Sequence, residues 1–93
     1  MRLQLSQDKS GKSAVFVNPE RVDERDIFSA ALKKLRATPA VSDLVCQEGP
    51  SADYVTGRVQ SNSFTLIYDF DYGASVRVDN PESIKIIKGI FES

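Results

Sequence analysis

The alternation of apolar and polar residues between Val55 and Asp79 constrains the fold of this chain more than any other feature. Apolar side chains recur at every second position, and two breaks, at residues 61–62 and 71–73, contain residue types common in turns. A period of two over segments of this length is typical of β-strands with one buried face. The stretch therefore predicts a three-stranded antiparallel meander.

The two turns also predict a pairing register. A two-residue turn at 61–62 pairs Val59 with Phe64, and a three-residue loop at 71–73 pairs Phe70 with Ala74. A slip of one residue would turn every side chain to the opposite face, so both turns support one apolar face. The predicted buried face comprises Val55, Gly57, Val59, Phe64, Leu66, Tyr68, Phe70, Ala74, Val76 and Val78. The predicted outer face comprises Thr56, Arg58, Gln60, Thr65, Ile67, Asp69, Ser75, Arg77 and Asp79. The lack of a side chain at Gly57 indicates either a close approach by another group or a bulge.

The segments around this meander predict further strands and two helices. Residues 2–6 and 13–17 favour a hairpin. A helix over about 24–37 follows, capped either by Asp23 or by Asn18. At the other end of the chain, residues 80–93 predict a helix with an unusually wide apolar stripe. Such a helix is expected to lie between the sheet and another element, or between two subunits.

Residues 39–48 admit two interpretations. Thr38 as a cap and Pro39 at the first helical position favour a short helix. Alternatively, residues 41–46 form a strand that pairs with the meander, as in ferredoxin-like domains. In both interpretations Cys46 is expected to be a small core residue.

The predicted fold is therefore a single α+β domain over residues 1–93. Its elements follow the order ββα(α or β)βββα, with an antiparallel sheet of about five strands and two long helices packed on one face. A chain of this size buries about 65% of its unfolded surface, which is enough for one core.

The composition argues against several classes of function. Twelve basic and thirteen acidic residues give a net charge of −1, which argues against a strong nucleic-acid binder. The chain contains no histidine, so a triad or a zinc site of the usual kind is not expected. One cysteine and a first segment without an apolar run favour a cytoplasmic setting, and no stretch approaches the ~20 apolar residues of a membrane span.

The best candidate site is the tip of the meander, residues 68–73, where aromatic and acidic side chains alternate. Aromatic residues supply contact area at protein interfaces, and carboxylates give charge complementarity to a basic partner. The outer face next to this tip is predicted to bring Arg77 diagonally close to Asp69. The predicted partner-binding residues are Asp69, Asp71, Tyr72, Arg58, Arg77 and Asp79.

These observations favour a non-enzymatic protein-binding domain without a cofactor. Its most concrete form is a small intracellular inhibitor or immunity-type protein that neutralises a toxin or enzyme. The alternative is a ferredoxin-like regulatory domain that binds a small molecule as a dimer. A less favoured hypothesis is an enzyme that uses the carboxylates of Asp69, Asp71 and Asp79. The first hypothesis also allows a homodimer.

Overall fold

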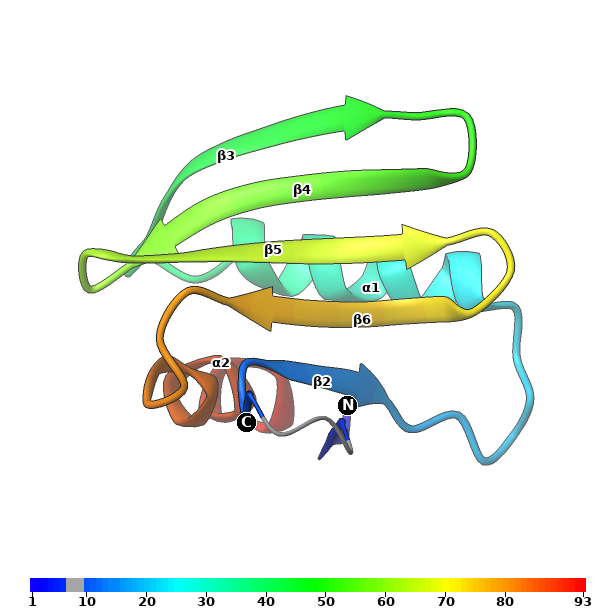
Figure 1. Ribbon diagram of the computed structural model, residues 1–93, viewed down its shortest axis with the longest axis horizontal. Coiled ribbons are helices and arrows are strands. Elements are labelled where there is room, and N and C mark those ends of the chain that lie inside the picture. Colours follow the sequence, from blue (N-terminus) through cyan, green and yellow to red (C-terminus); the bar gives the residue numbers. More distant parts are fainter. Residues whose placement is uncertain (7–9) are drawn as a thin grey trace.

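The computed structural model describes residues 1–6 and 10–93, and this part of the chain forms one antiparallel sheet with two helices (Figure 1). The strands are β1 (Leu3–Leu5), β2 (Ser13–Phe16), β3 (Val41–Glu48), β4 (Ala52–Val59), β5 (Asn62–Asp69) and β6 (Gly73–Val78), and the helices are α1 (Glu24–Arg36) and α2 (Ser83–Glu92). The predicted α+β class is confirmed. The sheet has six strands rather than about five, and α2 is only ten residues long.

The strand order is β1-β2-β6-β5-β4-β3, so α1 carries the chain from one side of the sheet to the far edge. From there the chain returns as a meander toward β2 (Figure 1). Helix α1 packs on β5 and β6, and α2 packs on α1, β1 and β6. The element order ββαββββα differs from the βαββαβ order of ferredoxin-like domains.

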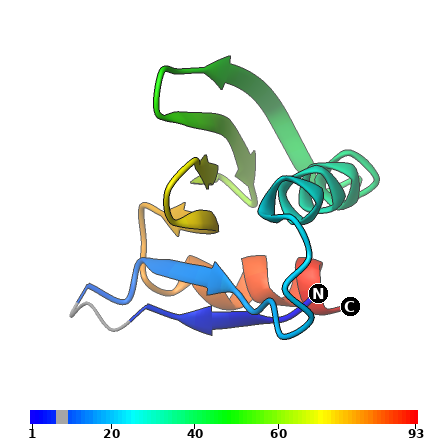
Figure 2. The same ribbon diagram turned by 90° about the vertical axis from the view of Figure 1, so that its right-hand side faces the viewer.

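One core lies between the sheet and the helices, and Figure 2 shows the curved sheet beside α1. Leu66 and Val76 from the sheet, Leu35 from α1, and Ile87 and Phe91 from α2 are almost completely buried in it. The wide apolar stripe of α2 is thus accounted for within one chain. Its partly buried isoleucines, Ile86 and Ile90, pack against the same core.

Both meander hairpins differ from the predicted register by two residues. The structure pairs Val59 with Asn62 and Asp69 with Gly73. The first turn consists of residues 60–61, which both adopt positive φ, as the tightest hairpin turns require. Because a shift of two keeps every side chain on its face, the predicted buried face is confirmed at most positions.

Phe70 is the exception on that face. The second hairpin loop contains residues 70–72, so Phe70 leaves the strand before the pairing ends. Its side chain is 44% exposed, and the prediction that it belongs to the core was wrong.

Of the two interpretations of residues 39–48, the helix is wrong and the strand is confirmed, because Val41–Glu48 forms β3. Pairing with β4 runs from Val41 opposite Val59 to Glu48 opposite Asp53. Backbone groups of β4 that would otherwise lack partners are satisfied by this pairing, which overrides the local helix signal. Cys46 is exposed on this edge strand, contrary to the predicted core position.

A bulge in β3 explains the glycine at position 57. Ser42 lies opposite Arg58 and Val45 opposite Thr56, so Asp43 and Leu44 together face Gly57. The Phe64 ring also covers Gly57, and a Cβ there would lie 2.7 Å from the Phe64 Cζ. Both predicted explanations therefore apply, with the bulge on the neighbouring strand.

The start of α1 follows local capping chemistry. The Asp23 carboxylate accepts a hydrogen bond from the Arg25 backbone N–H at 2.9 Å, which confirms Asp23 as the cap of α1. The predicted first hairpin is present, with Leu3 opposite Phe16. Part of its loop, residues 7–9, lies outside the described residues. Neither of the two described helices is long and apolar enough to cross a membrane.

Candidate functional site

The tip, residues 68–73, contains the hairpin loop of residues 70–72, which carries the most exposed aromatic side chain among the described residues. This loop joins β5 to β6 at the end of the sheet where β3 also ends (Figure 1). Tyr72 is 89% exposed, and Asp71 is exposed beside it. An aromatic side chain held this far out of the fold contributes almost nothing to the core. Its contact area is available to another molecule.

Hydrogen bonds hold the backbone of the tip in one conformation. The Asp69 carboxylate accepts from the backbone N–H groups of Asp71 and Tyr72, at 2.8 and 3.0 Å. The Phe70 N–H donates to the Ser51 carbonyl at 3.1 Å, which ties the tip to the loop between β3 and β4. Asp69 is therefore a loop-forming residue, and its carboxylate already accepts two bonds within the protein.

Glu24, the first residue of α1, anchors the other side of the tip. Its carboxylate accepts from the Ala74 N–H at 2.9 Å and from the side-chain amide of Asn18. Gly73 adopts a φ of +93°, and a Cβ at this position would overlap the Glu24 carboxylate. Only glycine satisfies both conditions. The start of the helix and the start of β6 are thereby locked together.

A row of aromatic rings supports the tip from the helix side. Phe28 of α1 lies 5.9 Å from Tyr68, and Tyr68 lies 5.3 Å from Phe70, measured between ring centroids. The Arg25 guanidinium stacks over Tyr68 at 5.8 Å. This row leaves the Phe70 ring 44% exposed. Phe70 therefore links the exposed end of the hairpin to the aromatic packing on α1.

The structure brings three of the six predicted site residues together and places the other three elsewhere. Asp69, Asp71 and Tyr72 form the tip region. Arg58, Arg77 and Asp79 lie toward the opposite end of the outer face, around Ser63 and Thr65. Thr65 lies four positions before Asp69 on β5, a distance of about 13 Å along a strand.

The predicted closeness of Arg77 to Asp69 was wrong because it depended on the register. Arg77 is paired with Thr65 rather than Ile67. Arg58 lies near the turn at residues 60–61, where its guanidinium donates to the Ser61 carbonyl at 3.4 Å. It also lines a shallow polar hollow with Thr56 and Thr65.

The carboxylates considered for catalysis do not form a cluster. Asp71 sits in the loop rather than on the strand face next to Asp69, and Asp79 follows the far end of β6. Among residues 1–6 and 10–93, no three Cys, Asp or Glu side chains are arranged so that they could hold a metal ion.

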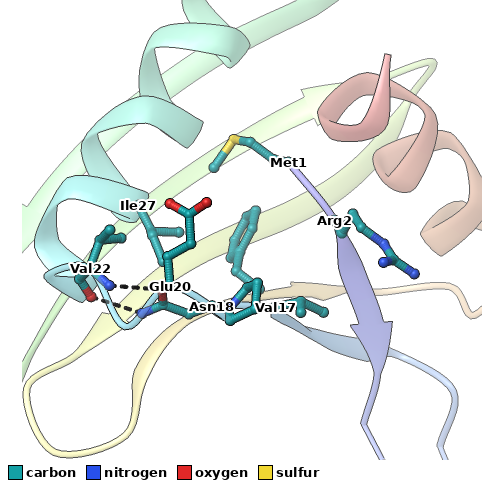
Figure 3. Close-up of a pocket in the computed structure, with 9 residues that line it drawn as sticks. Met1, Arg2, Val17, Asn18, Glu20, Val22 and Ile27 are labelled. Carbon is teal, nitrogen blue, oxygen red and sulfur yellow. Dashed lines mark hydrogen bonds between the residues drawn. The ribbon is translucent and has the colours of Figure 1, made fainter.

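A pocket of about 480 Å³ lies between the N-terminal residues, the end of β2 and the start of α1 (Figure 3). Its lining is mainly apolar and includes Met1, Phe16 and Ile27. The Asn18 amide is engaged by the backbone of Val22 at 2.8 and 3.0 Å. Figure 3 shows the Arg2 side chain pointing away from Met1 and Ile27. The polar residues of the lining are Arg2, Asn18 and Glu20, of which Asn18 is already engaged by backbone groups.

Sequence reasoning missed the residues that shape the tip. In the sequence, Glu24 is an ordinary acidic residue in the first turn of a helix. Phe28 is one residue of the apolar stripe of that helix. Their contacts with the tip arise from packing between segments about 40 to 50 residues apart, as in the bond between Ala74 and Glu24. One available signal was the Asx-type pattern of Asp69 followed by a short loop and Gly73, which indicates a loop-forming carboxylate.

Comparisons of the chain with known protein families, curated proteins and solved structures found no match.

Proposed function

We propose that the protein is a non-enzymatic protein-binding domain that engages a basic partner through its tip. The observation that carries this proposal is the 89% exposed Tyr72 on a loop whose backbone is fixed by Asp69, Ser51 and Glu24. A rigid loop loses little conformational entropy on binding, so more of the contact energy contributes to affinity. Tyrosine is also enriched among the residues that dominate binding energy at interfaces.

Charge near the tip supports a basic partner. Asp71 is exposed in the tip itself. Glu48 and Asp53 lie opposite each other on β3 and β4 at the same end of the sheet. Asp53 in turn pairs with Tyr68, so these carboxylates lie next to the aromatic row. Complementary charge accelerates association and disfavours acidic partners.

The most concrete form of this proposal is a cytoplasmic inhibitor or immunity-type protein that neutralises a toxin or enzyme. A small rigid domain that presents an aromatic and acidic tip suits the blocking of a basic active-site cleft. This form rests on architecture and surface chemistry, and its test is the loss of the partner's activity in the complex.

The first experiment identifies and measures the complex. The protein is immobilised and exposed to lysate of its source cells. A captured partner is then purified, and its affinity is measured by titration calorimetry. We expect a basic partner whose Kd rises about tenfold or more with Tyr72→Ala, the loss typical of a dominant interface residue. Inhibition of the partner's activity in the same titration supports the inhibitor form.

Arg77→Ala is the matched control, because Arg77 is exposed but lies toward the far end of the sheet. This variant should leave the Kd unchanged. If Asp71→Ala and Tyr72→Ala together leave the affinity unaltered, or if only Arg77→Ala weakens it, the tip is not the binding site.

A further inference from the structure

Strand β3 forms an open edge of the sheet next to the tip. It is the last strand in the order (Figure 1). Six of its eight residues are exposed. The opposite edge differs, because β1 has three residues and its Leu3 N–H donates to the Glu92 carboxylate of α2. Exposed edge strands present backbone groups that can pair with another chain.

Natural edges are often protected by lysine or by a bulge. β3 contains no lysine, and its bulge at residues 43–44 interrupts only the first half of the strand. The second half, Val45–Glu48, pairs regularly with β4 and ends beside the tip. The unprotected edge is therefore a short regular segment at the end of the sheet that carries Tyr72.

A groove runs along this segment on the helix side. Phe28 and Leu32 of α1 form one wall, and Cys46, Glu48, Asp53 and Val55 of the β3–β4 hairpin are among the residues of the other. Cys46 faces the helix side because it pairs with the buried Val55, yet it is exposed. A strand added beside β3 would point every second side chain toward this groove.

The charge of the hairpin selects the occupant. The β3–β4 hairpin contains Asp43, Glu48 and Asp53, and its cation Arg58 lies opposite Ser42, at the other end from Glu48 and Asp53. A second copy that paired through its own β3 would bring like charges together on a short segment, which disfavours it. An extended basic segment meets opposite charge instead.

We propose that β3 accepts an extended basic segment of the partner protein as a seventh strand. Apolar side chains of that segment enter the groove beside Phe28, Leu32 and Cys46. Its lysine or arginine side chains lie near Glu48 and Asp53. Backbone pairing provides affinity and the groove provides specificity, as in other cases of strand addition. This inference rests on the proposed function and extends the partner contact from the tip to the edge.

The test uses a short blocked peptide in which lysine alternates with valine, labelled for fluorescence anisotropy. The controls are a glutamate–valine peptide of the same length and a lysine–valine peptide with every backbone N–H methylated. Only the unmethylated basic peptide is expected to bind. In ¹⁵N-labelled protein it should shift and protect the backbone amides of Val45–Glu48.

Glu48→Lys combined with Asp53→Lys should weaken this binding about tenfold, the sum expected for two exposed ion pairs. Circular dichroism verifies that the variant is folded. Equal binding of the methylated peptide would overturn the inference, as would amide shifts confined to other strands. A free protein that sediments as a dimer paired through β3 would also overturn it, because the edge would then be occupied.

Tyr72→Ala separates the two proposals. It should leave peptide binding unchanged while it weakens the complete partner. If the peptide does not bind but Tyr72→Ala still weakens the complete partner, only the strand-addition proposal is overturned. If the peptide binds but Tyr72→Ala does not weaken the complete partner, the proposal that the tip binds the partner is overturned.

Discussion

Replacing Gly57 with alanine probes the most crowded point of the sheet. The new Cβ would lie 2.7 Å from the Phe64 Cζ and 2.8 Å from the Leu44 Cδ2. Carbon atoms pack optimally at about 3.5–4.0 Å, so both side chains would have to move by close to 1 Å. Phe64 is 2% exposed and has little room for this movement.

The expected cost follows from this overlap. Overpacking a core typically costs about 1–3 kcal/mol. The alanine also restricts the unfolded chain, which offsets about 0.4–1 kcal/mol. We expect Gly57→Ala to lower the free energy of unfolding by about 1–2 kcal/mol, which for a domain of this size lowers Tm by about 4–8 °C per kcal/mol. Urea unfolding followed by far-ultraviolet circular dichroism measures it.

Two further variants make the explanation refutable. Gly89→Ala is the matched control, because nothing lies within 4 Å of a Cβ at that exposed helical position. It should raise the free energy of unfolding by about 0.5–1 kcal/mol. Phe64→Leu removes part of the overlap, so the double variant with Gly57→Ala should be more stable than the sum of the single effects by about 1 kcal/mol. Strict additivity, or a neutral Gly57→Ala, would refute the crowding argument.

Three other predictions concern the tip and the edge strand. Asp69→Ala should destabilise the protein by about 1 kcal/mol and speed hydrogen exchange at residues 71–72, because two N–H groups lose their acceptor. Asp69→Asn keeps an acceptor oxygen and should lose less, so equal exchange in both variants would contradict this role. Gly73→Ala should lower the free energy of unfolding by about 2 kcal/mol or more, because position 73 has a positive φ and the new Cβ overlaps Glu24. Thermal unfolding measures this loss. A loss smaller than that of Gly57→Ala would argue against Glu24 as the anchor. Cys46→Ser should change the free energy of unfolding by less than about 0.5 kcal/mol, and the native thiol should react rapidly with a disulfide reagent; slow labelling would mean that the thiol is covered.

The candidate site was predicted in part. Alternating aromatic and acidic residues marked the tip correctly as an exposed loop with Asp71 and Tyr72. The sequence did not reveal that Asp69 would accept hydrogen bonds from that loop, nor that Arg77 would lie about 13 Å from it along the sheet. Both features depend on the pairing register of the hairpins, which differs by two residues from the register predicted from the composition of the turns. Glu24 and Phe28 entered the site only through contacts between distant segments.

By itself, the sequence determined the α+β class, the side of the sheet on which most meander residues lie, and a helix over about residues 24–37 with Asp23 as one of two candidate caps. These properties are local, since a period of two, a helical stripe and a cap each depend on neighbouring residues. The tertiary structure decided the pairing register and the conversion of residues 41–48 into a strand. It also placed Phe70 and Cys46 at the surface. Register depends on which residues adopt left-handed φ in the turns, and β3 exists because β4 offers unpaired backbone groups.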